Sequence, residues 1–410
     1  RLFRSEVVER VIEETVTLLK NEKLKWMFAN CFPNTLDTTV FYESEPEDDT
    51  FVVTGDIPAM WLRDSSAQVW PYLMYANEDE RLRKMIRGVI LRQFRLVLLD
   101  PYANAFYRDL SGKGEWQNDR TPMRGGIHER KWEIDSLCYV VRLAYHYWKV
   151  TGDDSVFTAE WMQVVESILT VFKDQQRKEN RGNYSFLRVT DRQYDTLSND
   201  GYGNPVRANG LIASSFRPSD DATVYPFLIP SNFFAVTSLR QMEEILLKVN
   251  KNKAMARACN VLYMEVGEAL KKHAIHKHPT YGKIYAFEVD GYGNQLCMEN
   301  TRKYLLSLDN PYFFKGKYAE GIGGPHIGMD MVWPMSIIIR AMTSENDEEI
   351  KLCVAMLLAT DANTGFMHES FHKDQPEKFT RSWFAWQNSL FGELVLKIIR
   401  DGKLHLLNEL

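Results

Sequence analysis

The sequence predicts an all-α protein whose inner and outer helices form two concentric rings, an (α/α)6 barrel. Helix follows helix along the 410 residues, and no linker or low-complexity stretch interrupts them. Strongly apolar, aromatic-rich helices, which favour an interior position, alternate with charged amphipathic helices, which favour the surface. The apolar helices follow long glycine-bearing loops, whereas the amphipathic ones follow short turns. We therefore expect a single catalytic domain, residues 1–410, with long loops and small hairpins gathered at one end of the inner helices.

The helical spacing of apolar residues gives the expected elements in chain order. A first amphipathic helix is expected at residues 4–20, and a small hairpin at residues 38–42 and 50–53. Pro58 suits the first turn of the next helix, which should continue to about Tyr75. A second hairpin is expected at residues 283–292. Inner helices are expected to begin near residues 59, 130, 220, 329 and 382, and outer helices to cover residues 79–99, 157–176, 252–274 and 346–359.

Composition excludes several classes of function. The net charge of −5 and the pI near 6.1 argue against a nucleic-acid partner, and no basic run contradicts this. No apolar run is long enough to span a bilayer. The five cysteines are scattered and form no CxxC pattern, which is typical of buried, reduced thiols. We therefore expect a monomeric cytoplasmic protein that binds neither nucleic acid nor membranes.

The stretch at residues 54–70 carries the first indication of chemistry. Trp61, Arg63 and Asp64 are crowded into the start of one helix. An indole can cover the C–H face of a sugar ring, while a guanidinium and a carboxylate bind its hydroxyl groups. The alternative is a structural Arg63–Asp64 ion pair beside a core tryptophan. The same kind of helix start recurs along the chain, which favours the interpretation as a sugar-binding site.

Carboxylates and tryptophans without a Ser or Cys triad point to carbohydrate hydrolysis, which needs one protonated acid and one ionised carboxylate. The Asp220–Asp221 doublet is a candidate for the acid, since neighbouring like charges raise one pKa; the alternative is a helix cap beside a solvated carboxylate. Glu393 stands in a strongly apolar helix and is either paired structurally or used in catalysis. From their positions we expect the following residues to contact substrate: Trp61, Arg63, Asp64, Glu129, Asp135, Arg217, His368 and Glu369.

Residues 368–372 match H-E-x-x-H, the signature of zinc peptidases, and Glu393 lies at a plausible distance for a third ligand. The signature requires a helix that places both histidines on one face. The flanking residues have the composition of a loop, so we expect no metal. His368 and Glu369 instead bind substrate hydroxyls or order the loop.

Three motifs together resemble glycoside hydrolase family 125, and the similarity extends over nearly the whole chain. They are Gly55-Asp-Ile-Pro-Ala-Met-Trp-Leu-Arg-Asp-Ser-Ser66, Phe216-Arg-Pro-Ser-Asp-Asp221 and Asn388-Ser-Leu-Phe-Gly-Glu393. Within the family the chain is most similar to bacterial members of the clostridial type. The resemblance implies an (α/α)6 barrel and an exo-acting, inverting α-1,6-mannosidase that needs no metal or other cofactor. It also implies Asp220 as general acid and Glu393 as general base, acting on α-mannosides such as N-glycan-derived oligosaccharides.

Two other functions remain open on the residues alone. A sugar epimerase on the same toroid would use histidines such as His326 and His368. A non-catalytic glycan-binding protein would be served equally well by Trp61, Trp132 and Trp383, but it would not need a buried Glu393.

Overall fold

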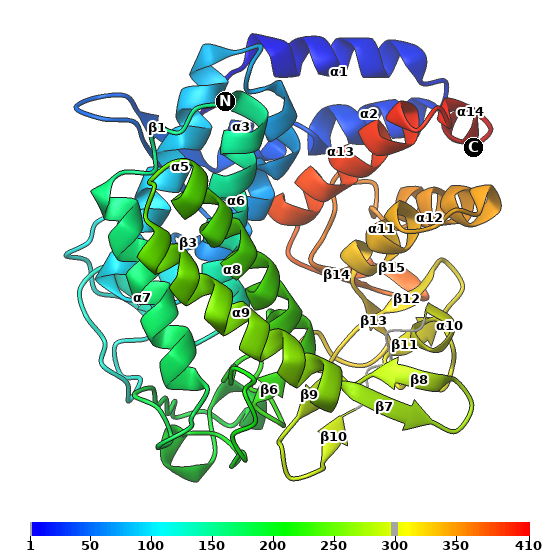
Figure 1. The fold of residues 1–410 in the computed structure, drawn as a ribbon. Coiled ribbons are helices and arrows are strands. Elements are labelled where there is room, and N and C mark those ends of the chain that lie inside the picture. Colours follow the sequence, from blue (N-terminus) through cyan, green and yellow to red (C-terminus); the bar gives the residue numbers. More distant parts are fainter. Residues whose placement is uncertain (1, 297–301) are drawn as a thin grey trace.

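The computed structural model describes residues 2–296 and 302–410 and shows a toroid of helices with small sheets at its loop-rich end (Figure 1). The inner helix α4 contacts α6 and α13, α6 also contacts α8, and α13 also contacts α11. Between α9 and α11 the described residues form short strands, loops and one short helix. The inner helices are α4 (Leu62–Val69), α6 (Ile134–Thr151), α8 (Ile229–Lys248), α11 (Pro334–Met342) and α13 (Ala385–Arg400). The (α/α)6 prediction is confirmed.

Amphipathic helices cover this ring. The outer helix α5 packs on α6, α9 on α8 and α12 on α11, while α1, α2 and α3 lie on the side of α13 and η1. Their bounds are α1 (Glu6–Leu18), α2 (Glu22–Cys31), α3 (Asn34–Thr38), α5 (Glu80–Leu99), α7 (Ala159–Gln175), α9 (Lys253–His273), α12 (Asp347–Ala359) and α14 (Leu404–Asn408). The short helical turns are η1 (Trp70–Tyr75), η2 (Gln193–Asp195), η3 (Asn199–Gly201) and α10 (Arg302–Leu305).

Short antiparallel sheets connect the helices. The pair β1–β2 forms the first expected hairpin, with Val40 opposite Val52. The sheets that the structure describes are β1 (Val40–Glu43) with β2 (Asp49–Val52); β3 (Met60–Trp61), β4 (Ala105–Phe106) and β5 (Ile127–Glu129); β6 (Phe227–Leu228), β9 (Glu288–Val289) and β10 (Gln295–Leu296); β7 (Ile275–His278) with β8 (Gly282–Tyr285); β11 (Phe313–Lys315) with β12 (Glu320–Ile322); and β13 (Met331–Val332), β14 (Ser370–His372) and β15 (Gln375–Thr380).

Three local predictions are wrong, each for a local reason. The helix after Pro58 begins only at Leu62, because Met60 and Trp61 pair with β4. The inner helix expected near residue 220 begins at Ile229, because Asp220 has a left-handed φ of 65° inside a loop closed by a Phe216–Ala222 bridge. The second hairpin is β7–β8, not residues 283–292; Gly282, with φ 75°, lies at its turn.

The remaining predictions from composition concern cysteines and membranes. Cys31, Cys138, Cys259 and Cys353 are buried free thiols, as expected, and Cys297 lies outside the described residues. Among the helices that the structure describes, none combines the length and apolar character needed to cross a bilayer.

The interface between α5 and β2 gives a stability test. A methyl group on Gly88 of α5 would lie 2.4 Å from Thr50 Oγ1, which donates a hydrogen bond to the Met85 carbonyl. We expect Gly88→Ala to lower the free energy of unfolding by about 1–3 kcal/mol, because overpacking outweighs the gain in helix propensity. Gly267→Ala in α9 meets nothing within 4 Å and should instead be neutral or raise stability by up to about 1 kcal/mol. Urea unfolding of both variants checks this; equal effects would contradict it.

Candidate active site

The polar residues singled out in the sequence meet at the end of the barrel where α4 and α6 begin. The sheet β3–β4–β5 builds this place, since Trp61 pairs with Ala105 and Ala105 pairs with Glu129. One sheet thereby fixes the indole that precedes α4 and the carboxylate that precedes α6. Trp61 is 6% exposed and its ring contacts His128 edge-on at 5.2 Å between centroids.

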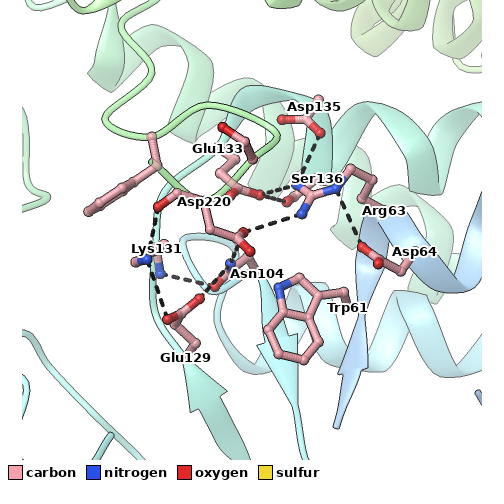
Figure 2. A network of polar contacts seen from close by, with 12 residues as sticks. Trp61, Arg63, Asp64, Asn104, Glu129, Lys131, Glu133, Asp135, Ser136 and Asp220 are labelled. Atoms are coloured by element: carbon pink, nitrogen blue, oxygen red, sulfur yellow. Dashed lines mark hydrogen bonds and ion pairs between the residues drawn. The ribbon is translucent and has the colours of Figure 1, made fainter. Parts of the chain in front are cut away.

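Arg63 holds the centre of the site (Figure 2). Its guanidinium lies 2.7 Å from Glu133 Oε2, 3.2 Å from Asp220 Oδ1 and 3.5 Å from Asp135 Oδ2. Its Nε lies 3.4 Å from Asp64 Oδ2. The side chains of Arg63, Asp64, Glu133 and Asp135 are at most 6% exposed. Arg63 therefore organises the carboxylates of the site in addition to any contact that it makes with a ligand.

Burial dominates the protonation of these carboxylates. It raises the pKa of Asp64 to about 6 and that of Asp135 above its usual value, although the charge of Arg63 opposes both shifts. It raises the pKa of Glu133 well above the usual range, again against Arg63. One guanidinium thus does not compensate all four carboxylates.

Asp220 reaches this cluster from the opposite loop. Its carboxyl is 27% exposed and accepts hydrogen bonds from Arg63 and, at 3.3 Å, from Asn104. The buried ammonium of Lys131 donates to the Asp220 carbonyl at 2.8 Å and holds the residue in its left-handed conformation. Burial alone would raise the pKa of Asp220, but the charges of Arg63 and Lys131 outweigh it and lower the pKa well below its usual value.

Glu129 belongs to an adjoining cluster. It accepts hydrogen bonds from Asn104 at 3.1 Å and from Arg188 at 2.9 Å, and Lys131 lies 3.6 Å away. Arg188 also binds Asp119 and Asp195. Glu129 is therefore fully engaged within the protein, and Asn104, which donates to both carboxyls, links it to Asp220.

The imidazole of His326 links Asp221 and Glu369. His326 Nδ1 lies 3.2 Å from Asp221 Oδ1, and His326 Nε2 lies 3.9 Å from Glu369 Oε1. Burial lowers the pKa of His326, but the hydrogen bond and charge of Asp221 outweigh it and raise the pKa overall. Glu369 is 13% exposed, and Arg381 Nε lies 3.4 Å from it. One imidazole thus separates Glu369 from the loop that carries Asp220.

A cavity of about 870 Å³ opens next to this imidazole. Aromatic side chains that include Tyr194, Tyr312 and Trp333 line it, together with Asp221 and His326. Arg217 also lines it and is bound by Glu288 at 2.6 Å. The expected contact residue Arg217 therefore faces this neighbouring cavity, where a second part of a ligand would lie.

His368 does not have the expected role of a substrate contact. Its side chain is buried, its ring stacks on Phe379 at 3.8 Å, and its nitrogens contact the carbonyls of Arg381 and Asp361 at 2.9 and 3.2 Å. It orders the loop, which was the alternative. The zinc interpretation fails as well, because β14 (Ser370–His372) is extended where the signature requires a helix, and the described residues contain no metal-ligating cluster of three.

Glu393 lies outside the site, contrary to the prediction. It lines a separate cavity of about 280 Å³ with Trp70, His146 and Arg400. His146 is 11 residues beyond Asp135 on α6, which places this cavity about 16 Å further along the barrel. Glu393 therefore does not face Asp220 across one pocket, because the depth of Glu393 in α13 carries it to the opposite end of the inner helices. Its assignment as general base stays a prediction, which this position does not favour.

Several polar atoms at the site have no hydrogen-bond partner within the described chain. Trp61 Nε1 and Asp135 Oδ1 are buried without one, and Asp64 Oδ2 has only its ionic contact with Arg63. Buried polar groups are rarely left unpaired unless a ligand or water satisfies them. These atoms are suited to the hydroxyl groups of a sugar.

Sequence reasoning missed Asn104, Lys131, Glu133 and Arg188. Lys131 and Glu133 could have been found, because an extended segment leads into α6 and alternate residues of such a segment share one side. Glu129, Lys131 and Glu133 contact the site, whereas Arg130 binds Asp100 and the Trp132 indole donates to the Ala213 carbonyl. Asn104 and Arg188 lie in irregular loops, where no periodicity indicates a direction.

The Arg63 cluster predicts a pH-dependent loss of stability. In Arg63→Met, buried carboxylates lose their cation, so we expect the free energy of unfolding to fall by about 3–5 kcal/mol at pH 7. Their folded-state pKa values then rise further above the unfolded values, so ionisation destabilises the fold as pH increases. The deficit against the parent should therefore shrink from pH 7 to pH 5. Thermal unfolding across this range measures it, and a deficit independent of pH would contradict it.

The chain is similar to known proteins over nearly its whole length. The chain is 41% identical over 452 aligned residues to the meiotically up-regulated gene 157 protein of Schizosaccharomyces pombe, covering 100% of this chain and 88% of that protein. A structure of a Streptococcus pneumoniae metal-independent α-mannosidase, in a non-productive complex with α-1,6-mannobiose, is 40% identical, with a TM-score of 0.93 over 98% of this chain and 100% of the other. These identities do not distinguish the clostridial subtype, which stays a prediction.

The family described as metal-independent α-mannosidase (GH125) matches residues 21–300 and 297–396, and so covers nearly the whole chain, including the loop of Asp220 and the helix start of Arg63. The chain therefore belongs to glycoside hydrolase family 125, the metal-independent α-mannosidases.

Proposed function

We propose that this glycoside hydrolase removes terminal, non-reducing α-1,6-linked mannose from oligosaccharides such as those derived from N-glycans, with inversion at the anomeric carbon. The observation that carries the proposal is the match to the pneumococcal relative, whose structure holds α-1,6-mannobiose. The aromatic cavity beside His326 supports it, since it offers room for the part of the substrate beyond the scissile bond.

Asp220 is the general acid of the proposed mechanism. Its carboxyl is the most exposed of those around Arg63, and two donors orient it. It gives a proton to the glycosidic oxygen as the bond to the anomeric carbon breaks. The positive charge that develops on the sugar ring is stabilised by the surrounding carboxylates, which are fixed before substrate binds.

Glu369 replaces Glu393 as the proposed general base. It lies 3.9 Å from the His326 imidazole, which contacts Asp221, the residue next to the proposed acid. Arg381 Nε lies 3.4 Å and His326 Nε2 lies 3.9 Å from its Oε1, so both side chains help to orient the carboxyl. An inverting mechanism needs a water between the base and the anomeric carbon, and in this proposal Glu369 activates that water.

The two alternative functions find less support. An epimerase needs a histidine that is free to accept a proton. Asp221 binds His326 and raises its pKa despite burial, which favours the protonated imidazole. His368 is buried, and its ring nitrogens contact backbone carbonyls. A glycan-binding protein would gain nothing from the partly exposed Asp220 carboxyl held by the Arg63 guanidinium. Of its three tryptophans, Trp132 is only 1% exposed and belongs to the core.

Incubation with α-1,6-mannobiose tests the activity and the stereochemistry together. We expect free mannose to appear first as the β-anomer, because water attacks the face opposite the leaving group. Proton NMR at early times distinguishes the anomers before they equilibrate. The α-anomer first would overturn inversion, and no release of mannose would overturn the proposed function.

Paired substitutions test the choice of base. We expect Glu369→Gln to lower kcat by roughly 100-fold or more while substrate binding persists, because it removes only the proton acceptor. Glu393→Gln, at the other end of the barrel, is the matched control and should stay within a few-fold of the parent. Steady-state kinetics on α-1,6-mannobiose measure both. The opposite ranking would restore Glu393 as the base.

A further inference from the structure

Glu133 is a buried carboxyl that the proposed mechanism does not yet use. It is the residue before α6, and its side chain is 0% exposed. Its Oε2 accepts hydrogen bonds from Arg63 at 2.7 Å and from Ser136 Oγ at 2.9 Å. Its Oε1 has no donor among the described residues. Burying an ionised carboxylate oxygen without a hydrogen-bond donor is costly, whereas a protonated carboxyl oxygen could itself donate a hydrogen bond.

Asp220 is the acceptor that such a proton would find. Arg63 Nη1 lies 2.7 Å from Glu133 Oε2 and Nη2 of the same guanidinium lies 3.2 Å from Asp220 Oδ1, so one guanidinium brings the two carboxyls together on the same side of Arg63 (Figure 2). Two carboxylates in contact repel each other, so a proton shared between them is favoured. The two carboxyls then act as one acid. Glu133 Oε2 and Asp220 Oδ1 bind Arg63, and the second oxygen of Asp220 is left to contact substrate.

The acid needs such a partner. Burial raises the pKa of Asp220, but the charges of Arg63 and Lys131 and the interaction with Glu133 lower it overall, which favours the ionised form that cannot protonate a leaving group. Burial shifts the pKa of Glu133 in the other direction despite Arg63. The proton that Asp220 lacks is thus kept next to it.

We propose that Glu133 is a positioning residue that stores the catalytic proton in a hydrogen bond to Asp220 and yields it when substrate is bound. The inference rests on the proposed function. One proton moves from Glu133 to Asp220 and from Asp220 to the glycosidic oxygen, which keeps the electron pair of the broken bond. Glu133 ends as a carboxylate already bound by Arg63 and Ser136, and solvent reprotonates the pair after the product leaves.

Other charged groups set the field in which this pair titrates. Arg63 and Lys131 favour its ionised forms, and the neighbouring carboxylates favour its protonated form. The groups that face Asp220 or Glu133 from the surrounding elements are Arg63 and Asp64 on α4, His128 on β5, Lys131 before α6, Asp135 on α6 and His326 before β13. The pair therefore titrates as a unit, and its loss should be visible in the pH profile of the enzyme.

Two substrates separate a proton-storing role from a structural one. α-1,6-Mannobiose needs a protonated leaving group, whereas 2,4-dinitrophenyl α-mannoside does not. We expect Glu133→Gln to lower kcat/KM on mannobiose by roughly 100-fold and on the aryl mannoside by less than about tenfold. Its alkaline limb on mannobiose should move to lower pH, because Asp220 then titrates alone. Asp100→Asn, which disrupts a buried contact with Arg130 away from the site, should affect both substrates equally.

Infrared spectroscopy tests the stored proton without relying on activity. Protein labelled with ¹³C-glutamate should show, at pH 7, a protonated carboxyl band that shifts with the label and disappears in Glu133→Gln but persists in Glu393→Gln. If Glu133→Gln does not fold, the parent and Glu393→Gln suffice, since the absence of a label-sensitive protonated carboxyl band in both would overturn the proposal. Equal losses on the two substrates would overturn it as well. Failure of the parent to cleave mannobiose would refute the proposed function, while the band would still decide on Glu133.

Discussion

A single guanidinium buried among carboxylates is the interaction on which the rest of this site depends. Arg63 contacts residues from the starts of α4 and α6 and from the loop of Asp220. Buried like charges repel strongly, so these three chain segments could not converge without a cation between them. Because one cation does not balance every carboxylate, the effect of burial prevails and the pKa values of Asp64, Glu133 and Asp135 are raised.

The toroid makes this convergence possible. Each inner helix is preceded by a loop or a short strand, so the first turns of the helices and their preceding residues gather at one end. The sheet β3–β4–β5 joins two of these approaches and fixes Trp61 opposite Glu129 through backbone hydrogen bonds. The polar side chains of the site are therefore positioned by backbone pairing and by helix starts.

The sequence supported the fold well, because the alternation of apolar and amphipathic helices reports burial directly. It supported the site only in part. Trp61, Arg63, Asp64, Asp135 and Asp220 do converge, since each stands at or near a helix start or in its preceding loop. Glu393 was misplaced because helical periodicity indicates which face is buried and not how deep along the barrel a residue lies. His368 was misjudged because its partners, the carbonyls of Arg381 and Asp361, are tertiary contacts that no local pattern encodes.

The extended run from Glu129 to Glu133 places alternate side chains on opposite sides, with polar groups toward the site and Trp132 toward the core. During evolution the length of this extended segment is more restricted than its composition. Inserting or deleting one residue there would send Trp132 into the sugar site and turn Lys131 and Glu133 into the apolar core, where neither charge has a partner. Insertions among related enzymes should therefore collect in the surrounding loops, while this short polar segment keeps a constant number of residues.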